Sequence, residues 1–192
     1  MDIATDIAEN DEGLLTPTKK TLVDIHRFVI EFSKNLVGPK FIHSGVVYEA
    51  TLESIENRLK GRKYTNTPVK NAIFVSEEIL FKILCEHPFV DGNKRTALMG
   101  ALMLLALNTK YYVNKKSDAR FEYVSPPEDI QIETGKDFEL LASWYEPRRH
   151  EEIYNLLIKN GIKIRTKNNI TEDHIRQYIR LFLLNRIKEV NE

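Results

Sequence analysis

The stretch from Lys94 to Asn108 constrains the fold most, because it predicts a helix that is apolar on nearly every side. Its apolar residues are Ala97, Leu98, Met99, Ala101, Leu102, Met103, Leu104, Leu105, Ala106 and Leu107. A helix without a polar face has to be covered by other elements of the fold. The apolar run is too short to span a bilayer. We therefore expect an all-α domain that is built around this helix.

A polar loop, His87-Pro88-Phe89-Val90-Asp91-Gly92-Asn93, runs directly into this helix. Upstream, Val69 to Glu86 predicts a second helix, which ends where Pro88 disfavours the α conformation of the residue before it. The first N–H groups of the downstream helix have no partner within it and lie at the positive end of its dipole. A helix start of this kind binds phosphate groups well.

Four residues at the helix start suit an anion site. Gly92 lets the backbone approach a ligand closely, because it has no Cβ atom. Asn93 can offer its side-chain amide. Lys94 and Arg95 add positive charge, and the planar guanidinium of Arg95 matches phosphate oxygens. These residues predict a site for the phosphates of a nucleotide.

His87 and Asp91 are the candidate reactive groups of the loop. Asp91 is a hard oxygen ligand of the kind that Mg²⁺ accepts alongside nucleotide phosphates. Imidazole exchanges protons near neutral pH, which makes His87 the candidate general base. Taken singly, each residue has a structural alternative: His87 as a cation at a helix C-terminus, and Asp91 as a turn or helix-capping residue.

The run from His87 to Ala97 resembles the signature of the Fic/Doc (death-on-curing) family, His-Pro-Phe-x-Asp/Glu-Gly-Asn-Gly/Lys-Arg. Every fixed position of that signature is filled. The resemblance extends over about residues 16–113 and includes Leu22 to His26 in an early predicted helix. It implies a Fic-type helical domain, with the apolar helix buried at its centre directly after the motif loop.

The resemblance also implies a reaction, in which AMP or phosphate passes from ATP to a hydroxyl group of a target protein. By position, His87 would deprotonate the hydroxyl of a serine, threonine or tyrosine, and Asp91 would hold Mg²⁺. The four residues of the helix start would bind the phosphates of ATP. The loop therefore predicts a transferase that is either a nucleotidyltransferase or a protein phosphotransferase.

Two positions favour the Doc-like branch, which transfers phosphate. Many AMP-transferring members have glycine in place of Lys94 and a second arginine in place of Leu98. A Doc-like member would be a toxin that a separate antitoxin protein restrains. Alternatives from other classes are a non-catalytic binding module and a DNA-binding regulator that uses the C-terminal helices.

The chain divides into an acidic lead-in at residues 1–15, a Fic/Doc domain at 16–147 and a helical extension at 148–192. The extension is expected to pack on the domain or on a partner chain, which leaves a homo-oligomer open. Residues 62–68 have two interpretations. They form either a β-hairpin flap, which in this family docks the target by strand addition, or a plain loop between helices.

The lead-in contains a three-residue pattern, Thr5, Glu9 and Asn10, that fits the inhibitory helix of the family. In that helix the glutamate pairs with the second arginine of the motif. Because Leu98 stands at the position of that arginine, we interpret the pattern as a coincidence.

Composition sets limits on partners and location. Lys and Arg number 28 and Asp and Glu number 28, so net charge gives no pull toward nucleic acid or a membrane surface. A single cysteine, Cys85, allows no intrachain disulfide, which fits a reducing, cytoplasmic location.

Several further elements follow from local patterns. Glu77 and Glu78 are predicted on the solvent side of the helix before the motif. Short strands are predicted at residues 111–113 and 162–165. A final helix begins after Thr171, and its apolar stripe extends to Val190.

Overall fold

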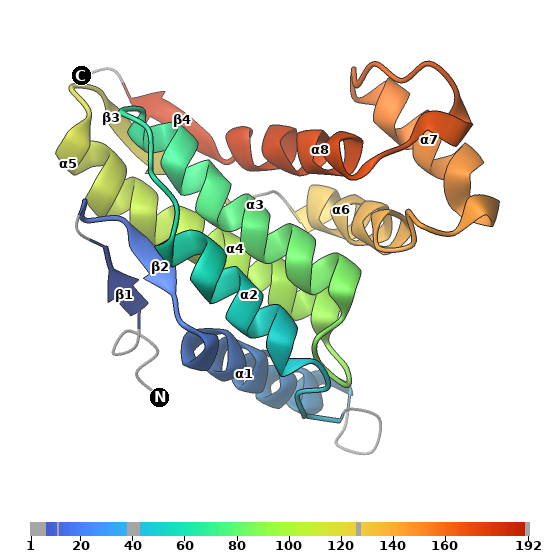
Figure 1. Ribbon diagram of the computed structural model, residues 1–192, viewed down its shortest axis with the longest axis horizontal. Helices are drawn as coiled ribbons and strands as arrows, with labels where there is room; N and C mark the ends of the chain where they lie inside the picture. Colours follow the sequence, from blue (N-terminus) through green and yellow to red (C-terminus); the bar gives the residue numbers. More distant parts are fainter. Residues whose placement is uncertain (1–6, 11, 38–42, 126–127, 191–192) are drawn as a thin grey trace.

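The computed structural model describes residues 7–10, 12–37, 43–125 and 128–190, and it confirms an all-α fold (Figure 1). Its α-helices are α1 (Lys19–Val37), α2 (Glu49–Lys60), α3 (Pro68–Glu86), α4 (Asn93–Asn108), α5 (Asn114–Lys116), α6 (Glu128–Leu141), α7 (His150–Lys159) and α8 (Glu172–Leu184). Two small antiparallel hairpins accompany them: β1 (Ile7–Glu9) with β2 (Leu15–Pro17), and β3 (Arg120–Tyr123) with β4 (Ile187–Val190). Among the helices in these ranges, none combines the length and the apolar content that spanning a bilayer requires.

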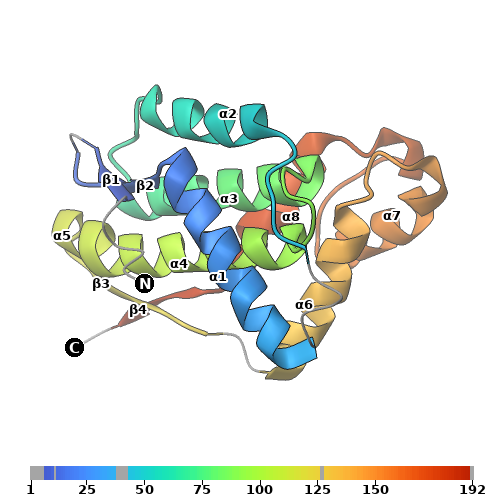
Figure 2. The same cartoon turned by 90° about the horizontal axis from the view of Figure 1, so that it is seen from below.

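The helices on either side of the motif, α3 and α4, form the centre of the fold. They lie side by side, with α2 and α8 against α3 and with α1 and α6 against α4 (Figure 1, Figure 2). The fully buried apolar residues of α3 are Ala72, Val75, Ile79, Leu80, Ile83 and Leu84. The helix α4 is less enclosed than its sequence predicts, because Met99 is 43% exposed. The neighbouring helices cover only part of its circumference.

Glu77 and Glu78 correct a prediction, because they are buried rather than on the solvent side. The helix α8 packs across α3 and supplies Arg176, whose Nη1 lies 3.1 Å from Glu77 Oε1 and 3.0 Å from Glu78 Oε2. Arg180 of α8 also pairs with Glu77, and Arg58 of α2 lies 3.3 Å from Glu78. Buried carboxylates persist where cations pair with them. This buried cluster fixes α8 to the centre of the fold.

Three local predictions in the C-terminal half are wrong. Residues 111–113 belong to a π-helical turn that continues α4, and residues 162–165 form a loop rather than a strand. The final helix ends at Leu184, and Ile187–Val190 form a strand that pairs with β3. Such short segments fit a helix, a strand or a loop equally well, so contacts with distant segments decide among them.

The inhibitory helix pattern does not correspond to a helix where the structure describes it. Glu9 belongs to β1, and the side-chain oxygen of Asn10 accepts hydrogen bonds from Glu12 N (3.1 Å) and Leu14 N (2.8 Å). Asn10 thus caps the turn between β1 and β2. Thr5 lies outside the described residues. The strand agrees with the interpretation of this pattern as a coincidence.

Candidate functional site

The predicted site residues lie together at one end of the α3–α4 pair, in the loop that joins these helices and in the first turn of α4. A pocket of about 230 Å³ is lined by His87, Val90, Asp91, Gly92, Asn93, Lys94 and Arg95. All six residues that the sequence predicts for base, metal and phosphate binding therefore face a common space.

His87 has an unusual backbone conformation. It ends α3 with φ 48° and ψ 58°, and among the described residues it is the only non-glycine residue with positive φ. This left-handed conformation costs a residue with a Cβ atom about 1 kcal/mol. The side chain of His87 is exposed, so the conformation presents the imidazole to the pocket and the solvent.

Asn93 holds the loop together from inside. Its Oδ1 accepts a hydrogen bond from Phe89 N (2.9 Å), and its Nδ2 donates one to Phe89 O (2.8 Å). The sequence suggests that this amide is free for a ligand, but in the structure it already bridges the loop. Phe89, whose ring is buried, thereby anchors the loop in the core.

Gly92 is required by both conformation and space. Its φ is 73°, and a Cβ atom there would lie 3.1 Å from Ile30 Cδ1 on α1. Thr96 N donates to Gly92 O at 2.8 Å, which begins the hydrogen bonding of α4. Because α4 begins directly after this left-handed turn, the N–H groups that follow Gly92 lie at the positive end of the α4 dipole.

The charged residues of the loop lie at its surface. Asp91 Oδ1 accepts from Gly92 N at 2.5 Å and lies 3.4 Å from Arg95 Nη2. Lys94 Nζ lies 3.2 Å from Glu139 Oε1 of α6. Ion pairs between exposed side chains are worth about 0–1 kcal/mol, so an incoming phosphate can replace these carboxylates as the partner of both cations.

The segment before α2 pairs with the motif loop in the manner of a strand. Val47 N donates to Pro88 O at 2.7 Å, and Val90 N donates to Gly45 O at 3.0 Å. Residues 62–68, by contrast, contain no strand. They lead into the N-terminus of α3, which lies at the opposite end of this helix from the motif loop (Figure 1). The flap interpretation of 62–68 is therefore wrong, and the plain-loop alternative is correct.

His26, which the sequence predicts only as part of an early helix, lies on α1 against the motif loop. It is 1% exposed, and its ring stacks on Phe89 with 3.9 Å between centroids. Its Nδ1 lies 3.1 Å from Thr96 Oγ1. Burial lowers the pKa of His26 from 6.5 to about 4, against a smaller opposing effect of Asp91. The imidazole is therefore neutral at physiological pH.

This pKa shift predicts an acid-dependent loss of stability. The unfolded chain binds a proton at His26 more readily than the folded chain between pH 6.5 and about 4, so stability falls as the pH drops through that window. The full effect is about 3 kcal/mol at 1.36 kcal/mol per pKa unit. Urea unfolding at several pH values should give a shallower pH dependence for His26→Phe than for the wild type. Equal slopes would contradict the shift.

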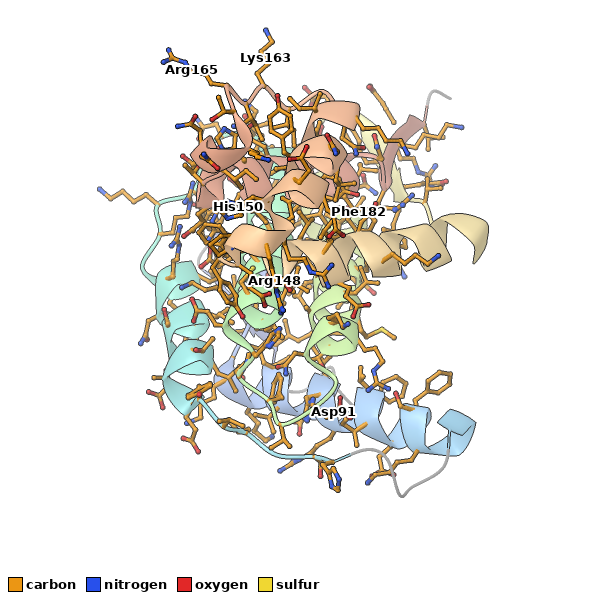
Figure 3. The ribbon with its side chains drawn as sticks, turned by 90° about the vertical axis from the view of Figure 1, so that its right-hand side faces the viewer. Asp91, Arg148, His150, Lys163, Arg165 and Phe182 are labelled. Carbon is orange, nitrogen blue, oxygen red and sulfur yellow. The ribbon has the colours of Figure 1, made fainter. Side chains whose placement is uncertain are left out.

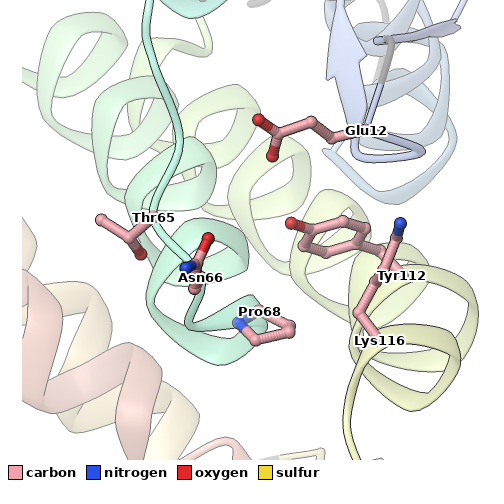
Figure 4. A pocket seen from close by; sticks show the side chains of 6 residues that line it. All are labelled: Glu12, Thr65, Asn66, Pro68, Tyr112 and Lys116. Carbon is pink, nitrogen blue, oxygen red and sulfur yellow. The ribbon is translucent and has the colours of Figure 1, made fainter.

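A second pocket, of about 280 Å³, is formed where α2 leads into α3 (Figure 4). The start of α3 lies at the opposite end of the α3–α4 pair from the motif loop (Figure 1). It is lined by Glu12, Thr65, Asn66, Pro68, Tyr112 and Lys116. The Tyr112 hydroxyl accepts a hydrogen bond from Asn71 Nδ2 at 3.0 Å. This lining includes one carboxylate and no histidine, so the motif pocket is the better candidate for catalysis.

Fold and site together define an all-α domain in which two central helices are joined by a loop that carries an exposed histidine and a candidate anion site. Residues 16–105 match the family model described as the Fic/DOC family, and through these residues the protein is a Fic/Doc family protein. This family consists generally of transferases that act on protein targets with ATP and, typically, a divalent metal. Neither the curated proteins nor the solved structures contain a match to the chain.

Proposed function

We propose that the protein transfers AMP or phosphate from ATP to a serine, threonine or tyrosine hydroxyl of a target protein. The observation that supports this function is the single pocket that joins His87, Asp91 and the start of α4. A base, a carboxylate and an anion-binding helix start are the groups that such a transfer needs.

The proposed step forms one bond to phosphorus and breaks another. The hydroxyl oxygen of the target attacks the α- or the γ-phosphorus of ATP while His87 accepts the hydroxyl proton. The leaving group is pyrophosphate when AMP is transferred and ADP when phosphate is transferred. The backbone at Gly92 and Asn93 and the cations Lys94 and Arg95 hold the phosphates at the start of α4.

Asp91 fits a role in holding Mg²⁺. Its carboxylate is partly exposed at the pocket, and the described residues form no cluster of three or more His, Cys, Asp or Glu side chains that would bind a metal by themselves. Magnesium often takes one or two carboxylates and fills its other positions with phosphates and water. When bound, the ion would neutralise charge on the phosphates.

Phosphate is the favoured transferred group. Leu98 is partly buried against the core, so this helix turn offers no cation for a terminal phosphate. The second positive charge of the site comes instead from Lys94, which directly precedes Arg95. A family member that transfers phosphate would resemble the toxin of a toxin–antitoxin pair. We therefore propose that this protein acts as such a toxin and is located in the cytoplasm.

The target is expected to dock beside the segment that precedes α2. Val47 is 50% exposed and Tyr48 is 58% exposed, and Val90 of the motif is 54% exposed. Residues 45–48 already pair with the motif loop, so a target strand that extends this pairing would lie next to His87.

The DNA-binding alternative receives no support from the basic residues of the C-terminal helices. Arg148 pairs with Glu146 at 2.7 Å, Arg149 with Glu152 at 3.1 Å, and Lys167 with Glu151 at 2.5 Å. Lys163 and Arg165 project outward, away from Arg148 (Figure 3). Carboxylates pair with three of these five cations, and the other two point away from them, so these residues do not form a basic strip for phosphates.

Label transfer in a cell lysate with Mg²⁺ tests the proposal. ATP labelled at the γ-phosphate should label a target protein, and ATP labelled at the α-phosphate should not. His87→Ala is the control and should give no label. Label from the α-phosphate alone would identify AMP transfer and would show that Lys94 and Leu98 do not mark the phosphate branch. No label from either nucleotide would favour a non-catalytic binding module.

A further inference from the structure

One side chain of α1, that of His26, contacts Phe89 in the motif loop and Thr96 in the first turn of α4, and it lies close to Gly92 between them. The His26 ring lies parallel to the Phe89 ring, with 6° between the two planes. A Cβ atom at Gly92 would lie 3.8 Å from His26 Cε1. Thr96, which hydrogen-bonds with His26 Nδ1, follows directly after the predicted phosphate-binding residues.

We propose that His26 is a positioning residue for the transfer reaction, which it supports by holding the motif loop in its active shape. This inference depends on the proposed function. The ring stack and the hydrogen bond of His26 reach Phe89 and Thr96 rather than His87 or Asp91. His26 acts through Phe89 and Thr96, which bound the segment that presents Asp91 and the phosphate-binding residues.

The buried polarity of His26 argues against a packing role alone. Its Nε2 has no hydrogen-bond partner among the described residues. A buried nitrogen without a partner costs about 1–3 kcal/mol, a cost that leucine or phenylalanine would avoid. What the imidazole adds over these residues is the hydrogen bond with Thr96 Oγ1, in the first turn of α4.

The motif loop depends on the stacking of His26 on Phe89, because the hydrogen bonds of Asn93 that bridge the loop are made to Phe89. Asn93 binds both the N–H and the carbonyl group of Phe89, so the position of Phe89 sets the position of the turn. Phe89 in turn rests on His26. Misplacement of catalytic groups by about 1 Å can cost about 10²-fold in rate, so a small shift of this ring stack is sufficient to slow the reaction.

The double variant His26→Phe/Thr96→Val separates positioning from packing. It removes both partners of the hydrogen bond and keeps an aromatic ring on Phe89. We expect the Tm to stay equal or rise, kcat to fall at least about tenfold, and KM for ATP to change less than about twofold. Thr96→Ser keeps the hydroxyl and should keep kcat. Ile25→Val, which alters packing against Gly100 instead of the loop, should lower Tm and leave kcat unchanged.

A stable double variant with wild-type kcat would overturn the positioning role. Hydrogen exchange gives a readout that does not need transfer: amides of residues 89–96 should exchange faster in the double variant, and amides of α8 should not. If the wild-type protein transfers no label, the proposed function fails. Hydrogen exchange alone then decides whether His26 holds the motif loop in place. Unchanged exchange at 89–96 would refute the holding of the loop, and faster exchange would support it.

Discussion

Replacing His87 by glycine is expected to remove most of the transfer activity and to stabilise the fold at the same time. His87 adopts φ 48° and ψ 58°, a conformation that costs a residue with a Cβ atom about 1 kcal/mol and costs glycine almost nothing. A general base contributes about 10²–10⁴-fold to a rate. Label transfer should therefore fall by about 10²–10⁴-fold, while urea titration gives a free energy of unfolding about 1 kcal/mol higher.

The same substitution at His150 provides the matched control. His150 has an ordinary helical φ of −59° at the start of α7, and its Nε2 lies 3.1 Å from Trp144 O. Glycine is unfavourable there, so His150→Gly should lower the free energy of unfolding by about 1 kcal/mol and leave transfer unchanged. If both variants lose stability alike, His87 is not strained. If His87→Gly keeps its activity, His87 is not the base.

The site could be predicted from the sequence because its residues are contiguous. His87 to Arg95 span the junction of two helices with strong apolar patterns, and any packing of those helices keeps these residues together. The boundaries of α3 and α4 differ from the predicted ones by a single residue at their N-termini. Proline, glycine and the apolar periodicity act locally, so they specify this part of the fold without long-range information.

The misassigned residues depend on partners that are distant in the sequence. Local periodicity places Glu77 on the solvent side of α3, and only the packing of α8 brings Arg176 against it. The sequence likewise predicts His26 only as part of a helix, and the contacts with Thr96 and Phe89 become evident only in the folded structure. A sequence pattern gives the face of a helix, but it does not say which helix covers that face.

Arg176→Met is expected to destabilise the fold strongly and to lower its free energy of unfolding by about 3–5 kcal/mol. Arg176 is buried, and besides its bonds to Glu77 and Glu78 its Nε lies 2.6 Å from Glu172 Oε1 and its guanidinium stacks over the Phe81 ring. Removing one partner of a buried ion pair leaves charge uncompensated in a medium of low polarity, which accounts for a loss of about this size.

The loss should arise from the stranded carboxylates rather than from the missing packing of Arg176. Adding Glu78→Gln to Arg176→Met should therefore recover part of the lost free energy of unfolding, because it removes a buried charge. Arg148→Met serves as the control: its side chain is 80% exposed in a pair with Glu146, and such pairs are worth about 0–1 kcal/mol. Urea titrations of the three proteins measure these differences. If Arg176→Met costs no more than Arg148→Met, then Arg58 and Arg180 alone neutralise the buried glutamates, and α8 is held to α3 by its apolar contacts.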